Sequence, residues 1–364
     1  MADTVRAAVQ LGPRRIEVQE FPRPVIGPDE GLVRIEANGV CGSDVEQYKG
    51  ALGNREYPTI PGHEPIGVVE EIGERAAERL GVQVGDRVVV EIIAACRSCR
   101  RCLSGKAQSC QNRYGTHGVS PVSHAPSLWG GLAEYLYLSP GSMVHRMRND
   151  VPIDLAATFN PLAAGIRWCY RLGGTQLGDT VLVLGAGQRG LASVIAAKAV
   201  GAETVIVTGL AADAHKLALA RELGADHTIV VDEEDTVARV TEITDGEMAD
   251  VVLELTPMAA GPVTDALRSV RHGGRVVLAG LKGGREIPFV SDLVIQRAAT
   301  VVGAYGVDSQ GYEDAIRIIE SGRHPLERLH THAFGLDDAA LALETLAGEV
   351  PGERAVAVSV QPWL

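Results

Sequence analysis

The sequence lacks several features that would place it in other classes of protein. It holds no run of about 18 consecutive apolar residues, so we expect no membrane span, and the segment before Ile16 has no apolar stretch typical of a signal peptide. Basic residues are outnumbered, 34 against 46 acidic, and the net charge of −12 argues against a nucleic-acid partner. Aromatic residues make up only 4%, whereas glycine occurs 42 times, which is typical of a tightly turned α/β protein.

Cysteine is also scarce, with six in 364 residues, but its distribution is uneven. Five of the six fall between Cys41 and Cys110. In a chain without signs of secretion, cysteines are more often metal ligands than disulfide partners, and we expect a cytoplasmic protein. The length, with 46% hydrophobic and 22% charged residues, predicts a globular protein of two domains.

The pattern of short strands changes near residue 155. Before that point, strands separated by Gly-Pro, Pro-Gly and Gly-Asp turns predict a barrel-like β domain. Between about 160 and 305, six apolar strands alternate with helical patterns such as Leu191–Val200, which predicts an open parallel sheet covered on both faces. The last 60 or so residues are expected to pack on the first domain. The expected strands are Val5–Gln10, Arg15–Glu20, Leu32–Ala37, Pro65–Ile72 and Arg87–Ile93, then Thr180–Leu184, Thr204–Thr208, His227–Val231, Asp250–Leu255, Arg275–Ala279 and Thr300–Ala304.

Four cysteines form the strongest motif, with the spacing C-x2-C-x2-C-x7-C. Four thiolates at such short intervals can surround one Zn²⁺ tetrahedrally and leave no position for substrate, so the predicted site is structural. An iron–sulfur cluster and a pair of disulfides are the alternatives. The four cysteines are Cys96, Cys99, Cys102 and Cys110, and the basic residues that would offset their charge are Arg97, Arg100, Arg101 and Lys106.

A second group of metal-binding residue types is split between two segments. Cys41 follows one expected strand, and His63 and Glu64 precede another. A catalytic zinc needs a thiolate, an imidazole and an open position, which Cys41 and His63 would provide, with Glu64 as third ligand or nearby carboxylate. Asp44 could fix the tautomer of His63 through its distal nitrogen. The alternative is a buried cysteine and an ordinary core histidine.

A glycine-rich segment, GAGQRG, lies between the strand Thr180–Leu184 and a predicted helix. Its first glycine permits a tight turn, its second lets the backbone approach a pyrophosphate, and its third lets the helix lie close to the strand. In this context the segment predicts a dinucleotide site. The residues assigned to it are Gly185, Gly187, Gln188, Arg189 and Gly190.

These motifs together resemble the zinc-containing medium-chain dehydrogenase/reductase (alcohol dehydrogenase) family. The segments CGSD and GHE and the four-cysteine motif carry the resemblance, which covers essentially the whole chain and is nearest to the polyol (sorbitol) and threonine dehydrogenase branch. The resemblance implies a GroES-like β-barrel catalytic domain from 1–157 and 306–364, with its structural-zinc lobe at about 94–112. It implies a Rossmann domain, a doubly wound parallel sheet, over 158–305.

The activity implied by the resemblance is that of a zinc-dependent alcohol dehydrogenase. Zinc would lower the pKa of an alcohol, secondary or polyol-like, and hydride would pass to NAD(P) in a cleft between the domains, giving the ketone or aldehyde. The family also implies a homodimer or homotetramer. The alternatives are a zinc-independent quinone or enone reductase of the same fold and a non-catalytic nucleotide-binding protein with a decayed metal site.

Three further site residues are assigned by the resemblance. Ser43 matches the hydroxyl that contacts the substrate oxygen in relatives and begins proton release, although it could also be a turn residue. Glu46 stands near the position where relatives often carry a relay histidine. Asn160 replaces a glutamate of the polyol branch that binds zinc or its water, so the metal would keep Cys41, His63 and Glu64 with water or a weak amide oxygen.

The choice between NAD and NADP depends on the end of the second parallel strand. Gly209 occupies the position where NAD enzymes place an acidic residue for the ribose hydroxyls, which would admit NADP. No arginine follows to bind a 2′-phosphate; His215 and Lys216 are the nearest basic residues, and the family commonly has a basic residue near Lys216 beside the adenine. We favour NAD, with NADP as the alternative.

The substrate specificity is expected to depend on an irregular loop, Arg113–Gly131. Tyr114, His117 and Trp129 are the residues of this loop expected to shape the cleft. Cys169 lies on a predicted helix, and we interpret it as a packing residue.

Overall fold

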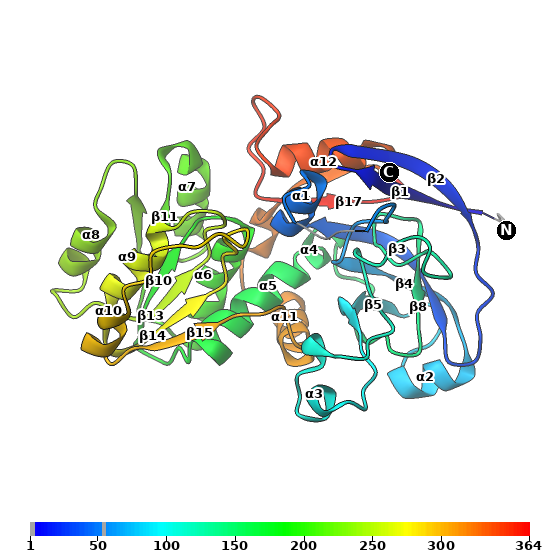
Figure 1. The fold of residues 1–364 in the computed structure, drawn as a ribbon, viewed down its shortest axis with the longest axis horizontal. Coiled ribbons are helices and arrows are strands. Elements are labelled where there is room, and N and C mark those ends of the chain that lie inside the picture. The colour runs from blue at the N-terminus through cyan, green and yellow to red at the C-terminus, as the bar shows by residue number, and fades with distance from the viewer. Residues whose placement is uncertain (1–3, 53–55) are drawn as a thin grey trace. The chain divides into compact units, whose positions relative to one another are not determined.

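The computed structural model describes residues 4–52 and 56–364, and the chain forms two compact units (Figure 1). The first unit runs to Asn160 and takes in Ile316–Ser321 and His330–Leu364. The second unit comprises Pro161–Ala315 and Gly322–Leu329. Among the residues described, no helix has both the length and the apolar character needed to cross a membrane.

The first unit is built on a seven-stranded sheet. The strands of the unit are β1 (Thr4–Gly12), β2 (Arg15–Pro22), β3 (Gly31–Val40), β4 (Pro65–Ile72), β5 (Arg87–Val90), β6 (Ile93–Ala94), β7 (Gly115–Thr116), β8 (Tyr135–Leu138), β9 (Val144–Arg146), β16 (His330–Phe334) and β17 (Ala357–Val360). The sheet order is β16-β17-β3-β4-β5-β9, with β8 also paired to β3. All pairs are antiparallel except β16 with β17. The helices are α1 (Gly42–Tyr48), α2 (Glu74–Leu80), α3 (Arg100–Leu103), α4 (Ile153–Ala156) and α12 (Ala339–Leu346).

The pairing of β3 with β4 brings the two halves of the predicted catalytic metal site together. Asn38 near the end of β3 lies opposite Pro65, the first residue of β4. Leu32 and Val33 point to opposite faces of β3 and are fully buried in two different hydrophobic clusters, so both faces of this strand are covered. Cys41, which follows β3, therefore lies in the same corner as the residues that precede β4.

The second unit contains a six-stranded sheet in which every pair is parallel. Its strands are β10 (Thr180–Leu184), β11 (Thr204–Gly209), β12 (His227–Val230), β13 (Ala249–Glu254), β14 (Val270–Leu278) and β15 (Thr300–Gly303). Its helices are α5 (Phe159–Ile166), a π-helix over Arg167–Leu172, α6 (Gln188–Val200), α7 (Ala214–Glu222), α8 (Thr236–Ile243), α9 (Gly261–Ser269), α10 (Ser291–Gln296) and α11 (Ser309–Ser321), of which α5 and α11 extend into the first unit.

The strand order, β12-β11-β10-β13-β14-β15, reverses direction between β10 and β13. Right-handed crossovers on either side of this point place α6 and α7 on one face of the sheet and α8 and α9 on the other. Both faces are thus covered, which is why β10 is almost entirely apolar and buried. This architecture confirms the predicted fold class. The carboxyl ends of β10 and β13, where the order reverses, are where ligands bind in such sheets.

Two expected strands differ from those observed by more than a shift of up to three residues at an end. The segment Arg87–Ile93 is divided into β5 and β6, because β5 pairs with β4 and β9 whereas β6 pairs with β7. The strand β14 begins at Val270 rather than Arg275. The first residues of β14 include Gly273, which has φ +74°, and the pairing with β13 shifts in register there. Because glycine at positive φ is typical of turns, the sequence predicts a later start for this strand.

Candidate functional site

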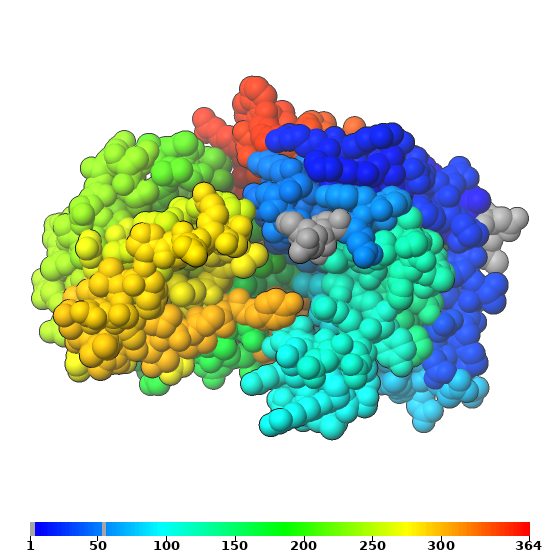
Figure 2. Space-filling view, in the orientation of Figure 1, coloured from blue at the N-terminus to red at the C-terminus, as the bar shows by residue number. Residues whose placement is uncertain are grey.

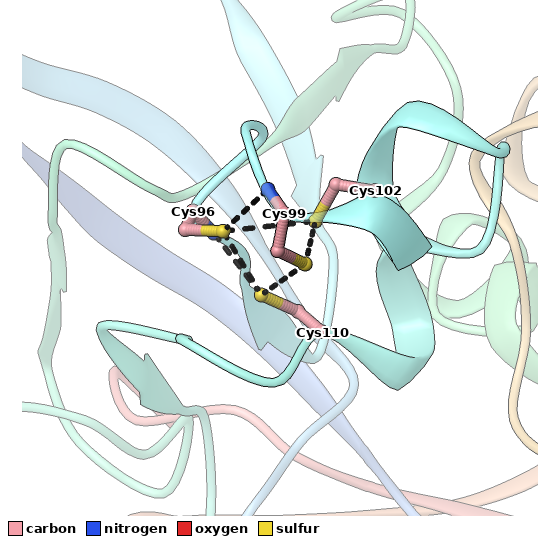
Figure 3. A group of neighbouring side chains, drawn as sticks. All are labelled: Cys96, Cys99, Cys102 and Cys110. Atoms are coloured by element: carbon pink, nitrogen blue, oxygen red, sulfur yellow. Dashed lines mark hydrogen bonds between the residues drawn. The ribbon is translucent and has the colours of Figure 1, made fainter.

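The four-cysteine motif forms one cluster of sulfur atoms (Figure 3). Cys99 precedes α3 and Cys102 lies within it, while Cys96 and Cys110 come from the flanking loops. The Sγ–Sγ distances are 3.5 Å for Cys99–Cys102 and Cys96–Cys110, 3.9 Å for Cys99–Cys110 and 4.0 Å for Cys96–Cys102. Sulfurs about 2.3 Å from a shared zinc at tetrahedral corners would be about 3.8 Å apart, so the cluster fits zinc. All four cysteines are free thiols, which excludes the disulfide alternative.

The local backbone favours thiolates at part of this cluster. Hydrogen bonds from the backbone at Ser98 and Cys99 lower the pKa of Cys96 to about 6. Burial instead raises the pKa of Cys102 to about 12. A cation bound among the four sulfurs would stabilise all four thiolates together, and would therefore also lower the pKa of Cys102.

The second group brings together Cys41, His63 and Glu64, whose ligand atoms all lie within 4.8 Å of one another. All three side chains are buried, and Glu64 is only 1% exposed. Gly39 on β3 is needed here, since an added Cβ would lie 2.7 Å from Oε2 of Glu64. A soft thiolate, an imidazole and a carboxylate at this separation form a donor set that suits a catalytic zinc with one position open.

Asp44 orients two members of this group. Its Oδ1 lies 2.9 Å from Nδ1 of His63, and its Oδ2 accepts a 2.9 Å hydrogen bond from the backbone N–H of Cys41. Burial alone lowers the pKa of His63, but the Asp44 carboxylate outweighs it and raises that pKa well above its ordinary value. With Nδ1 held by Asp44, Nε2 faces the other donors, 3.8 Å from Oε1 of Glu64 and 3.5 Å from Oγ of Ser43. Metal-binding histidines commonly donate the other ring N–H to a carboxylate in this way.

The other residues predicted near the metal have different environments. The Ser43 hydroxyl donates to Sγ of Cys41 at 3.3 Å, so it belongs to the group. Glu46 lies one turn further along α1 and is partly exposed. Asn160 is fully buried on α5. Cys169 is fully buried, with Sγ 3.2 Å from Oγ1 of Thr175, and burial raises its pKa to about 12, as for an inert packing thiol.

The glycine loop after β10 has the geometry needed for a dinucleotide. Gly185 has φ +110°, which favours glycine, and Gly187 is the N-cap of α6, with no atom within 4 Å of an added Cβ. A Cβ on Gly190 would lie 1.9 Å from the carbonyl oxygen of Gly185, so only glycine allows α6 to approach the strand this closely. The open backbone at the helix N-terminus fits a pyrophosphate.

Gln188 and Arg189 begin α6. The Arg189 guanidinium carbon lies 5.3 Å from the ring centroid of Trp168 on the π-helix, a cation–π contact. This contact keeps a positive charge at the helix N-terminus, where a phosphate would also lie.

The end of β11 carries acidic groups that the sequence interpretation missed. Gly209 is the last residue of the strand, and Nζ of Lys216 donates to Oδ1 of Asp213 at 2.8 Å. The N–H of Ala211 donates to Oδ1 of Asp232 at 2.8 Å. Asp232 follows the neighbouring strand β12 and is therefore distant in sequence from the end of β11, where an acidic residue was expected.

Two residues of the loop expected to determine specificity are packing residues. Trp129 and His117 are 2% and 0% exposed, with ring centroids 5.7 Å apart, and Nε1 of Trp129 donates to the carbonyl of His124. Burial lowers the pKa of His117. Tyr114 is exposed. The expectation was wrong for Trp129 and His117, because aromatic rings in this loop anchor it to the domain core.

Two family models match the chain. One, the alcohol dehydrogenase GroES-like domain, matches residues 27–149, and the other, the zinc-binding dehydrogenase, matches residues 190–321. The "Probable alcohol dehydrogenase adh" of Mycobacterium tuberculosis is 45% identical over 354 residues and 96% of each chain. The erythritol/L-threitol dehydrogenase of Mycolicibacterium smegmatis is 34% identical over 99% of this chain and 98% of its own. The sorbitol dehydrogenase of Bacillus subtilis is 31% identical over 93% of each.

Solved structures share the fold over nearly the whole chain. The alcohol dehydrogenase TADH from Thermus sp. ATN1 superposes with a TM-score of 0.86 at 27% identity, covering 98% of this chain and 99% of its own. A protein of Sinorhizobium meliloti 1021, described as a zinc-binding dehydrogenase and bound to NADP, gives 0.86 at 26% identity, covering 99% and 100%.

Proposed function

Because this chain belongs to the zinc-containing medium-chain alcohol dehydrogenase family, we propose that its substrate is a secondary alcohol or a polyol, oxidised to the ketone. The chain is an NAD(P)-dependent enzyme with zinc as its metal. Relatives named for erythritol, threitol and sorbitol support the polyol class. The alternatives, a zinc-independent reductase or a non-catalytic protein, are not favoured by these relatives.

The group formed by Cys41, His63 and Glu64 carries this proposal. Zinc bound there would act as a Lewis acid and lower the pKa of an alcohol. Cys41 and His63 would be its ligands, with Glu64 as third ligand or nearby carboxylate, while Asp44 keeps Nε2 of His63 directed at the metal. All three donors are buried, so a zinc ion bound by them would be largely shielded from bulk solvent.

Ser43 and Glu46 are proposed to release the alcohol proton. The Ser43 hydroxyl lies between the sulfur of Cys41 and Nε2 of His63, so it is beside the position where an alcohol oxygen would bind. Glu46, three residues further on α1 and partly exposed, would pass the proton to solvent directly or through water. Asn160 would leave the metal with one negative charge fewer than the glutamate of the polyol branch.

Metal analysis and a substrate panel test this function together. Purified protein should hold about two zinc ions per chain, and Cys41→Ala should lose one of them. A panel of primary alcohols, secondary alcohols and polyols, each with NAD⁺ and NADP⁺, should give the highest kcat/KM for a secondary alcohol or polyol. Zinc content unaffected by Cys41→Ala, or a preference for primary alcohols, would overturn the proposal.

NAD is proposed as the cofactor rather than NADP. Lys216 is already paired with Asp213, and Asp232 lies against the same loop, so a 2′-phosphate would meet carboxylates rather than a free cation. We expect NADH to bind at least about tenfold more tightly than NADPH, and we expect Asp232→Asn to reduce this difference in affinity. Fluorescence titration measures the dissociation constants of NADH and NADPH for both proteins, and tighter binding of NADPH to the unsubstituted protein would contradict the proposal.

Self-association through the second unit is also proposed, as a homodimer or homotetramer. The segment from the end of β14 to just past the edge strand β15 carries exposed apolar side chains, which are Leu281, Phe289, Val290, Ile295 and Tyr305. In Figure 2 this part of the chain, yellow to orange, forms a continuous area of surface. An open strand edge beside apolar side chains is typical of an interface. Light scattering should give the mass of a dimer or tetramer, and Ile295→Asp should lower it.

A cytoplasmic location is proposed from the free thiols, because the four-cysteine cluster and Cys41 all require reduced sulfur.

We further propose that the catalytic domain comprises 1–157 and 306–364, with the zinc lobe at about 94–112, and the dinucleotide domain comprises 158–305. With these bounds, the glycine loop belongs to the dinucleotide domain, and the two cysteine-containing sites belong to the catalytic domain.

A further inference from the structure

A buried ion pair lies at the carboxyl edge of the parallel sheet, outside the residues assigned so far. Glu254, the last residue of β13, is fully buried, and its Oε1 accepts a 2.9 Å hydrogen bond from Nζ of Lys282. Lys282 follows β14, and its side chain is 11% exposed. A buried ion pair stabilises a fold little compared with apolar packing, so its placement suggests a functional role.

The pair is held directly against the glycine loop. Lys282 also donates to the carbonyl of Thr256, and the N–H of Thr256 donates back to Oε1 of Glu254 at 3.0 Å. The methyl carbon of Thr256 lies 3.0 Å from the Cβ position of Gly185. Glu254 itself pairs across the sheet with Leu184, the residue before the loop. The two charges therefore adjoin the turn that would bind the pyrophosphate.

The topology indicates which half of the cofactor this edge would face. In a doubly wound sheet, each half of a dinucleotide lies over one half of the sheet, on either side of the point where the strand order reverses. The residues assigned to the adenosine half, Gly209 and Lys216, follow β11. The nicotinamide half of a bound cofactor would therefore lie on the side of β13, β14 and β15, where Glu254 and Lys282 are found.

The two forms of the cofactor differ in charge at this half. The oxidised nicotinamide ring carries one positive charge and the reduced ring carries none, so a fixed charge nearby favours one form over the other. Glu254 alone would favour the oxidised form, and Lys282 alone would favour the reduced form. We propose that Glu254 and Lys282 act in opposite directions on the relative affinity of the site for oxidised and reduced cofactor, so that each charge offsets the effect of the other. This inference rests on the cofactor site described above.

Opposite substitutions of the pair test the proposal. The dissociation constants of NAD⁺ and NADH are measured by titration at pH 8 for Glu254→Gln, Lys282→Met and the double variant. Glu254→Gln should raise the ratio of the NAD⁺ constant to the NADH constant by about three- to tenfold. Lys282→Met should lower this ratio by a similar factor, and the double variant should restore it. If the pair has a purely structural role, the substitutions should weaken the binding of NAD⁺ and NADH equally and leave the ratio of their dissociation constants unchanged.

A more exposed ion pair in the same unit, remote from the glycine loop, provides the control. Lys198 and Asp226 pair at 2.6 Å near the start of β11, at the opposite edge of the sheet, so Lys198→Met should leave the ratio unchanged. If Lys282→Met does not fold, the ratios measured for Glu254→Gln and for the double variant test the inference. An unchanged ratio in Glu254→Gln, or a shift in the same direction in both single variants, would overturn the inference. Failure of the unsubstituted protein to bind either form would instead refute the cofactor site itself.

Discussion

Replacement of Asp44 by asparagine tests how the chain prepares His63 and Cys41 for a metal. The Asp44 carboxylate accepts from Nδ1 of His63 and from the N–H of Cys41, both at 2.9 Å. An asparagine has one acceptor oxygen and would turn its amide N–H groups toward the second donor. The loss of a charge-assisted hydrogen bond at a buried site costs about 1.5–3 kcal/mol, or roughly 10- to 100-fold in metal affinity.

A competition titration with a chromophoric zinc chelator measures this affinity. Asp44→Asn should release one zinc ion at a chelator concentration that leaves the unsubstituted protein loaded, while the zinc of the four-cysteine cluster stays bound. Asp86→Asn is the matched control, because Asp86 also accepts a backbone N–H, that of Gln83, but in a turn before β5. If Asp44→Asn holds both zinc ions as tightly as the control, the assigned role of Asp44 is refuted.

Three further changes have defined outcomes. Cys102→Ser should lower the zinc content by about one ion per chain, measured by mass spectrometry, and expose the lobe to proteases; unchanged zinc would contradict the structural site. Gly190→Ala should cost about 1–3 kcal/mol of stability and weaken NADH binding, because its methyl would lie 1.9 Å from a carbonyl oxygen of the loop. Hydrogen bonds from Arg14 and Lys49 lower the pKa of Glu349 from 4.5 to about 2. The ionised Glu349 carboxylate therefore stabilises the folded state fully above pH 4.5, and this contribution is lost as the pH falls toward 2. Glu349→Gln should therefore lower the urea midpoint at pH 6 but much less at pH 3, and an equal effect at both would refute this.

The parts of the fold that the sequence predicts best are those with local signals. The bounds expected for β4 and β10 are those observed, since apolar runs there are bounded by proline or glycine turns. Spacing alone predicts the four-cysteine cluster, and spacing together with the flanking strand and helix predicts the glycine loop, because the geometry of each is formed by residues close together in the sequence.

The parts that the sequence does not predict depend on contacts between distant strands. Glu254 and Lys282 are 28 residues apart and meet only because β13 and β14 pair in a particular register. Asp232 reaches the end of β11 for the same reason. Trp129 looked like a cleft residue because an irregular loop gives no periodicity from which burial can be predicted.

The proposed chemistry requires a metal held between the end of β3 and the start of β4, and anomalous diffraction at the zinc edge detects such a metal. Crystals of the zinc-loaded protein should show two anomalous peaks per chain. One should lie among the four cysteine sulfurs, and the other about 2.3 Å from Sγ of Cys41 and about 2.1 Å from Nε2 of His63. A single peak at the four-cysteine cluster, with His63 still bound to Asp44 and no metal beside Cys41, would show that the chain has no catalytic zinc.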